Sequence, residues 1–187
     1  SFAVTMEPKG LNDLVNYDAS SRIVEQINKH KISVLLNGLS KEFAEGLKND
    51  TVLNASGVYS QNKHKDVFFL SVNTTKGGIR QSDPDQWTKL MNDLKNIEEN
   101  NIVLFLSTPV FGPNGFKDHL EADLLHKQLL EAQKLDKNIF VVHGGSSNTS
   151  QLKDGIRYIE INTRTLENPE DIYKLGIVEF VVNGSDV

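Results

Sequence analysis

The sequence predicts a single α/β domain, spanning residues 1–187, in which helices cover a mixed β-sheet. Apolar runs rich in β-branched and aromatic residues recur along the chain, and Ile102–Leu106 is one of them. Such runs are typical of strands buried on both faces. Stretches with apolar residues at helical spacing separate these runs, which favours parallel strands joined by helices. A length of 187 residues suits one domain with a sizeable core.

The first part of the chain predicts a strand–helix–strand unit. Phe2–Met6 is expected to form a strand, residues 20–30 a helix, and Ile32–Leu36 a second strand parallel to the first. A short helix ending near Gly46 should follow. Two further strands are predicted over residues 52–59 and 67–73, with the polar residues 61–65 as the hairpin loop between them.

The rest of the chain continues the alternation of helices and strands. Ser82-Asp83-Pro84-Asp85 combines a cap residue, a proline and acidic side chains, which predicts the start of a second helix. The central strand at 102–106 comes next. A third helix over about 117–135, a buried strand at 139–142, and late strands at 156–162 and 177–182, expected to be antiparallel, complete the prediction.

Composition excludes several classes of protein. The net charge is −5 and the Lys and Arg residues are scattered, so no basic surface for nucleic acid or anionic membrane is expected. No apolar run approaches the roughly 18 residues of a membrane-spanning helix. The chain has no cysteine, which excludes disulfides, thiolate metal sites and cysteine nucleophiles. Its Ser-Phe-Ala start predicts a domain excised from a larger protein, and the compartment stays open at this point.

Polar residues follow the predicted buried strands. Glu7 and Lys9 come after the first strand, Asn37 after the second, Ser107 after the central strand and His143 after the next. In α/β folds, ligands lie outside the carboxyl ends of the strands. If these strands are neighbours, their polar residues should meet at one edge of the sheet and form a candidate site.

The pattern VNTTKGGIRQSDPDQWTKLMNDL, followed by NNIVLFLSTPVFGP, resembles the calcineurin-like metallophosphoesterase superfamily. In that family a strand leads through a glycine-containing turn to a Gln-Trp helix, and then to a strand that ends in a metal-binding His before Pro. The resemblance covers nearly the whole chain. It implies a metallophosphoesterase-like sandwich, a mixed sheet covered by helices, and in active members two metal ions that activate a hydroxide and hold a phosphate.

The residues at the metal-ligand positions of that family are largely replaced here. The Asp-x-His motif corresponds to Glu7-Pro8-Lys9, Gly-Asp to Asn37-Gly38, the His before Pro to Ser107, and Gly-His-x-His to residues 144–147, with His143 one place early. The resemblance therefore implies a degenerate pseudoenzyme without a metal cofactor. It implies a structural or ligand-binding role in a larger secreted or cell-surface bacterial protein, with the other domains of that protein as partners. The alternative is an active phosphoric-ester hydrolase with a rearranged site that uses Glu7 and His143, with His119 as a further candidate, and a divalent metal such as Mn or Zn.

A second candidate site lies on the third predicted helix. His119, Asp123 and His126 stand at positions i, i+4 and i+7, so they share one face and could reach one metal ion. The charged neighbours Lys117 and Lys127 favour an ordinary solvated face instead.

A third candidate is the loop that follows His143. Its amides and hydroxyls could hold a small anion or a sugar, although it lacks the spacing of a phosphate-binding or dinucleotide-binding glycine loop. Two other roles are open for His143, as a hydrogen-bonded core imidazole or as a base for a Ser107 nucleophile oriented by Glu7. The ligand-binding residues predicted here are Ser107, Thr108, His143, Gly144, Gly145, Ser146 and Asn148.

Overall fold

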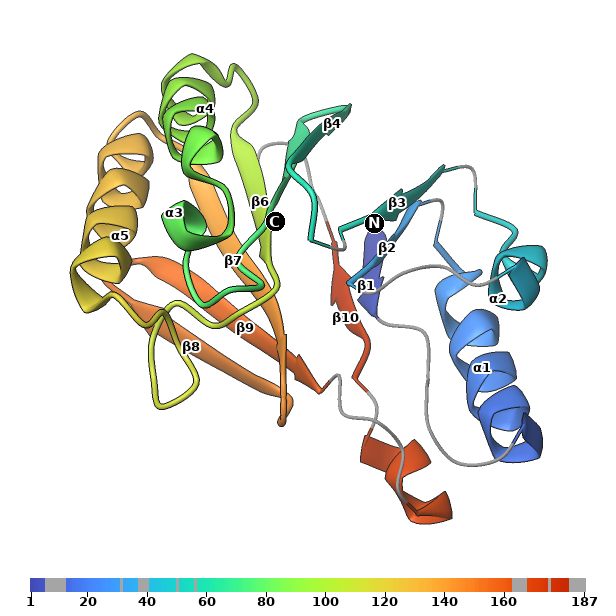
Figure 1. Ribbon diagram of the computed structural model, residues 1–187. Helices are drawn as coiled ribbons and strands as arrows, with labels where there is room; N and C mark the ends of the chain where they lie inside the picture. The colour runs from blue at the N-terminus through green and yellow to red at the C-terminus, as the bar shows by residue number, and fades with distance from the viewer. Residues whose placement is uncertain are drawn as a thin grey trace.

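The computed structural model of the protein describes residues 1–5, 13–30, 32–36, 41–49, 51–55, 57–162, 168–174 and 176–181. Their strands form two sheets, one of four strands and one of six. Helices α1 and α2 lie beside the smaller sheet, and α3, α4 and α5 lie beside the larger one (Figure 1). The predicted α/β class with helix-covered, mixed β-structure is confirmed, but the described strands form two sheets instead of the single sheet predicted.

The four-stranded sheet has the order β10-β1-β2-β3. β1, β2 and β3 are parallel, and β10 pairs with β1 in the antiparallel direction. Helix α1 joins β1 to β2, so the predicted strand–helix–strand unit is confirmed. The elements on this side are β1 (Phe2–Thr5), α1 (Asp13–Ile27), β2 (Ile32–Leu35), α2 (Lys41–Gly46), β3 (Thr51–Asn54), the short 3-10 helix η1 (Pro169–Lys174) and β10 (Val178–Phe180).

The six-stranded sheet has the order β4-β5-β6-β7-β9-β8. Its four inner strands are parallel, and the edge strands β4 and β8 run antiparallel to their neighbours. The elements are β4 (Ser60–His64), β5 (Val67–Val72), α3 (Ile79–Ser82), α4 (Pro84–Asn96), β6 (Asn101–Leu106), α5 (His119–Gln133), β7 (Asn138–Gly145), β8 (Thr149–Lys153) and β9 (Ile156–Asn162).

Each face of the larger sheet has its own apolar core. On one face, strand residues such as Leu104 pack with Leu90 of α4 and Leu125 of α5. On the other face, the two sheets pack against each other through an aromatic cluster, in which Phe2 of the smaller sheet meets Phe69 of the larger sheet edge-on with ring centroids 5.0 Å apart. β6 is buried along its whole length because both of its faces are covered, as the run Ile102–Leu106 predicts.

The edges of the larger sheet differ from the prediction. Residues 61–65, expected to form a hairpin loop, belong mostly to strand β4, and the turn is at Lys65, which has a φ of 51°. β8 was not predicted at all. Both are edge strands with mostly exposed side chains, so they need no apolar run. β9 is antiparallel to β8, as expected for a late strand, but parallel to β7.

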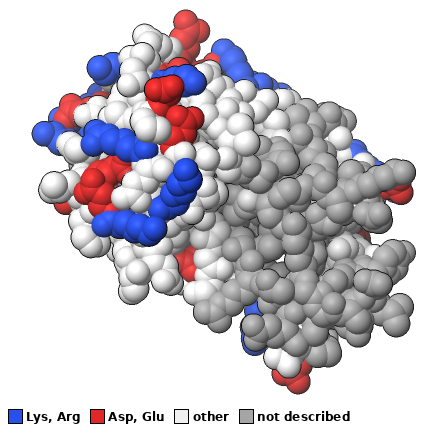
Figure 2. All heavy atoms as spheres, viewed as in Figure 1, with Lys and Arg blue, Asp and Glu red and all other residues white. Residues whose placement is uncertain are grey.

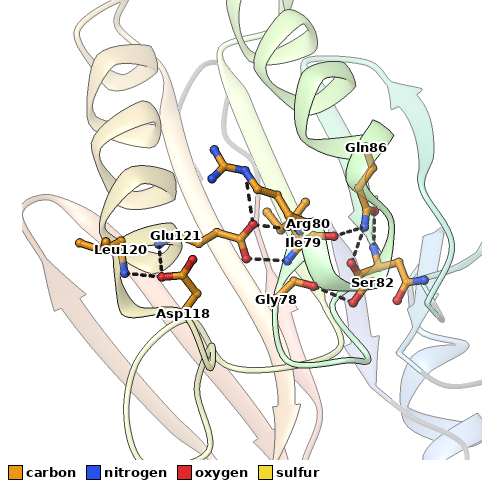
Figure 3. Close-up of polar contacts among 9 residues, drawn as sticks. Gly78, Ile79, Arg80, Ser82, Gln86, Asp118, Leu120 and Glu121 are labelled. Carbon is orange, nitrogen blue, oxygen red and sulfur yellow. Dashed lines mark hydrogen bonds and ion pairs between the residues drawn. The ribbon is translucent and has the colours of Figure 1, made fainter.

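A buried polar network holds the turn after β5 against helices α4 and α5 (Figure 3). Glu121 of α5 is 1% exposed and accepts hydrogen bonds of 2.9 Å from the backbone N–H groups of Ile79 and Arg80. Gln86 of α4 bonds both the N–H and the carbonyl of Asn73. These contacts satisfy the first amides of α3 and fix the loop at the carboxyl end of β5.

Candidate functional site at the carboxyl edge of the six-stranded sheet

The carboxyl ends of β5, β6, β7 and β9 lie at one edge because these strands are parallel neighbours. The loops after β5 and β6 are tied together there. The Thr108 N–H donates to the Thr74 hydroxyl at 2.9 Å, and the Thr108 hydroxyl donates to the Thr74 carbonyl at 2.7 Å. Thr108 therefore joins two strand ends, while Ser107 beside it is exposed.

A cavity of about 90 Å³ opens at this edge. The β6–α5 loop supplies one wall, with Phe111 as its aromatic residue. β7, β9 and β8 supply the floor and rim. We call it the His143–Glu160 cavity, and its lining residues are Pro109, Val110, Phe111, His143, Thr149, Gln151, Lys153, Tyr158 and Glu160.

His143 is 6% exposed and lines this cavity. Its Nδ1 lies 3.1 Å from the Gly144 carbonyl oxygen. Because a carbonyl can only accept, Nδ1 carries the hydrogen and Nε2 of the neutral ring is an acceptor. Nε2 has no hydrogen-bond partner among the residues that the structure describes. Burial lowers the pKa of His143, against smaller raising effects from the Gly144 carbonyl and Glu160, so the neutral ring dominates at pH 7.

Glu160 lies directly opposite His143 in the register of β7 and β9. Its Oε1 accepts three hydrogen bonds of 2.8 Å, from the Ser146 N–H, the Ser147 N–H and the Ser147 hydroxyl. Burial raises the pKa of the Glu160 carboxyl, but these hydrogen bonds outweigh burial and leave the pKa below its ordinary value. Glu160 is therefore a fixed, ionised carboxylate at neutral pH.

Aromatic residues close the opposite side of the cavity. The Lys153 ammonium lies 3.7 Å from the centre of the Phe111 ring, a cation–π contact. Tyr158 Oη is 2.7 Å from His126 Nδ1, and His126 Nε2 is 3.0 Å from Asp154 Oδ2. Burial, followed by the charge of Asp154, raises the pKa of Tyr158. Tyr158 therefore stays a neutral phenol with its hydroxyl engaged.

The predicted loop after His143 has a different role from the one expected. Its amides at Ser146 and Ser147 bind Glu160, so they are not available to an anion. Asn148 accepts from the Asn162 N–H and donates to the Lys174 carbonyl, which joins the loop to η1. Of the predicted ligand residues, His143 lines the cavity. The earlier candidates Glu7, Lys9 and Asn37 lie outside the described residues.

The three candidate metal ligands of α5 do not face one another. His119 and Asp123 are exposed, whereas His126 is buried and uses both ring nitrogens in the contacts with Tyr158 and Asp154. No group of three or more His, Asp or Glu side chains in the described part of the chain is placed to hold a metal ion.

Sequence reasoning missed Glu160, Gln151, Lys153 and Tyr158. The alternation in residues 156–162 does place Tyr158 and Glu160 on one face of a strand. What the sequence did not show is that β9 pairs with β7, because β8 intervenes in the chain. The available signal is an acid opposite a strand-end histidine, but it depends on that pairing.

Charges of both signs are mixed on the surface over α4 and α5, without a large area of one sign in this view (Figure 2). Within the described ranges, no helix is long and apolar enough to cross a membrane.

Residues 2–144 match the model of the UDP-glucose/GDP-mannose dehydrogenase family, NAD binding domain. The chain belongs to this family. Among solved structures, it is similar to one described as "GAP50 the anchor in the inner membrane complex of Plasmodium", with a TM-score of 0.55 and 9% identity over 87% of this chain and 71% of that chain. At that identity the likeness shows the fold alone. No curated protein matches the chain in sequence.

The family match overturns the predicted resemblance to calcineurin-like metallophosphoesterases. The two functions predicted from that resemblance, a metal-free pseudoenzyme module and a phosphoric-ester hydrolase, are corrected with it. The family match also overturns the carbohydrate- or anion-binding module predicted from the loop after His143. The resemblance depended on strands that lead through glycine turns to helices, a pattern that parallel α/β proteins of several families share.

The residues after the first strand do not fit a dinucleotide held by a three-glycine turn. That turn carries G-x-G-x-x-G, whereas residues 6–12 contain Gly10 as their single glycine. The other side of β1 is taken by the antiparallel β10, and the Thr5 hydroxyl donates to the Gly176 carbonyl at 2.8 Å. A dinucleotide-binding fold places its ligand in the crevice between the first strand and a second parallel strand on its other side. Among the described strands, β1 has no such parallel neighbour on that side.

Proposed function

We propose that this chain is a nucleotide-binding domain, with NAD as its ligand, and that binding takes place at the carboxyl edge of the six-stranded sheet. The family match over residues 2–144 carries the proposal, because the matched model is a NAD-binding domain. The place of binding is supported by the His143–Glu160 cavity, which lies where parallel strands end. Open α/β sheets bind their ligands at such edges.

The proposal for this chain is binding, not turnover. The matched model describes the NAD-binding part of a nucleotide-sugar dehydrogenase, so oxidation of a nucleotide sugar would involve the other domains of a larger protein as partners. Residues 6–12 lack the three-glycine turn, so the end of β1 offers no such turn to the pyrophosphate of NAD. We therefore derive no hydride-transfer step from the residues described.

Titration of ¹⁵N-labelled protein with NAD, followed by amide chemical shifts, tests the proposal. We expect saturable shifts in the β6–α5 loop and in residues 143–162. Inorganic pyrophosphate is the control and should cause no saturable shifts, because the amides of Ser146 and Ser147 already bind Glu160. Absence of NAD binding, or shifts confined to residues near the end of β1, would overturn the proposal.

A further inference from the structure

We propose that the His143–Glu160 cavity binds the vicinal diol of a ribose. The inference deepens the proposed function, because it rests on a nucleotide as the ligand and names the part that enters this cavity. The site lies on β7 and β9 of the larger sheet, far along the chain from the first strand–helix–strand unit.

Two adjacent acceptors define the site. His143 Nε2 is a lone-pair acceptor, as the Nδ1 contact to the Gly144 carbonyl requires. On the neighbouring strand, Oε2 of Glu160 has no hydrogen-bond partner within the described ranges, since the three hydrogen bonds to this carboxylate all end on Oε1. Because His143 and Glu160 are register partners, their side chains leave the sheet on the same face, and both line the cavity. A pair of neighbouring hydroxyl donors matches them.

Both acceptors are held in place before a ligand arrives. Three hydrogen bonds from the loop at 146–147 fix the Glu160 carboxylate. Gly145 makes room for it, because a Cβ at that position would collide with the Glu160 side chain. Binding would therefore cost little side-chain entropy, which is the benefit of preorganisation.

The charge of the cavity selects a neutral donor over an anion. Glu160 is ionised and His143 is neutral, so a phosphate placed beside them would be repelled. Lys153 is the one cation among the lining residues that the structure describes, and it stands at the rim over Phe111. A ribose diol can occupy the floor while the phosphate next to it points toward Lys153.

The volume fits one edge of a sugar ring. About 90 Å³ is several times the roughly 10–15 Å³ that one water molecule needs. Two hydroxyl groups and the carbons that carry them can enter such a space, while the base and the rest of the nucleotide stay outside. Val110 and Phe111 offer apolar surface to the ring carbons.

Comparison of methyl β-D-ribofuranoside with its 2-deoxy analogue tests the diol directly on the unmodified protein, because both rings are locked as furanoses and the 2-deoxy furanoside has no vicinal diol. We expect saturable amide shifts around His143, Glu160 and the β6–α5 loop with the ribofuranoside, and at least tenfold weaker binding of the deoxy sugar, which lacks one of the two hydroxyls. Equal binding of both sugars, or no ribofuranoside binding at high millimolar concentration, would overturn the subsite.

The NAD affinity of a Glu160 variant tests whether NAD uses the ribose subsite. Glu160→Gln should weaken NAD binding about tenfold, equivalent to roughly 1.4 kcal/mol, because it removes the charge that the hydroxyl donors bind. Glu131→Gln is the matched control, since Glu131 is exposed on α5 and pairs with Lys134. If Glu160→Gln does not fold, the sugar comparison still decides.

The outcomes separate the two proposals. NAD binding that is unchanged in a folded Glu160→Gln variant would overturn the subsite and leave the proposed function standing. Ribofuranoside binding without NAD binding would overturn the proposed function and leave the subsite standing. If the wild-type protein binds neither NAD nor the ribofuranoside, the proposed function and the ribose subsite are both overturned.

Discussion

At the scale of single residues, two buried hydroxyls should respond oppositely to removal. Ser71 Oγ is buried without a hydrogen-bond partner in the described part of the molecule, whereas the Thr5 hydroxyl donates to the Gly176 carbonyl. Ser71→Ala should leave the free energy of unfolding unchanged or raise it by up to about 1 kcal/mol. Thr5→Val, which keeps the shape, should lower it by about 1–2 kcal/mol because a buried carbonyl loses its donor.

Urea unfolding of both variants measures the difference. A clear loss of stability in Ser71→Ala would show that its hydroxyl has a partner, such as a buried water molecule. The small inter-sheet cavity of about 10 Å³ beside Ser71 is close to the lower limit for one water.

His143 also makes stability depend on pH. Its pKa in the folded protein is lower than the ordinary value of 6.5 because the ring is buried. Below pH 6.5 the unfolded chain takes up a proton that the folded chain does not, so the free energy of unfolding falls as the pH drops toward the lowered pKa. Glu160 acts at more acidic pH, because its pKa lies below 4.5.

We therefore expect His143→Gln to reduce the loss of stability between pH 7.5 and pH 5.5 compared with the wild-type protein. Denaturant unfolding at the two pH values measures this. An identical pH dependence in both proteins would mean that the imidazole protonates freely in the folded state.

At the scale of elements, α3 depends on a residue of another helix. Glu121 of α5 binds the first two amides of α3 from a buried position. Glu121→Ala leaves both amides without an acceptor and should lower the free energy of unfolding by about 2–4 kcal/mol. Glu131→Ala, an exposed change in the same helix, should stay within about 0.5 kcal/mol. Thermal unfolding compares them, and similar effects would contradict the role of Glu121.

Whether a strand could be predicted from the sequence depends on how much of it is buried. Ile102–Leu106 was recognisable because a strand covered on both faces must be apolar throughout, and β6 is buried along its length. β4 and β8 could not be predicted, because an exposed edge strand requires no apolar pattern in the sequence. His143 was found at the end of a buried strand. Glu160 was missed because its place opposite His143 depends on a pairing between β7 and β9 that no local pattern encodes.

At the scale of the whole molecule, the two sheets are held together by aromatic side chains. Phe180 of β10 stacks on Phe2 and meets Phe140 edge-on, with ring centroids 5.5 Å apart. Phe180→Ala should lower the free energy of unfolding by about 3–5 kcal/mol, since it opens a cavity between the sheets. Tyr173→Ala is the control, because Tyr173 is 80% exposed. Urea unfolding measures both, and a loss below 1 kcal/mol for Phe180→Ala would contradict this account.

The pairing of β10 with β1 also has a consequence during synthesis. Phe2 pairs with Phe180, almost the full length of the chain away. At about 5–20 residues per second, a ribosome needs on the order of ten to forty seconds to reach that strand. Throughout this interval the outer edge of β1 lacks its neighbour and the Phe2 ring lacks its stacking partner. The emerging chain therefore exposes the unpaired N–H and C=O groups of β1 for seconds. The yield of folded protein in the cell should depend on chaperones that shield this edge.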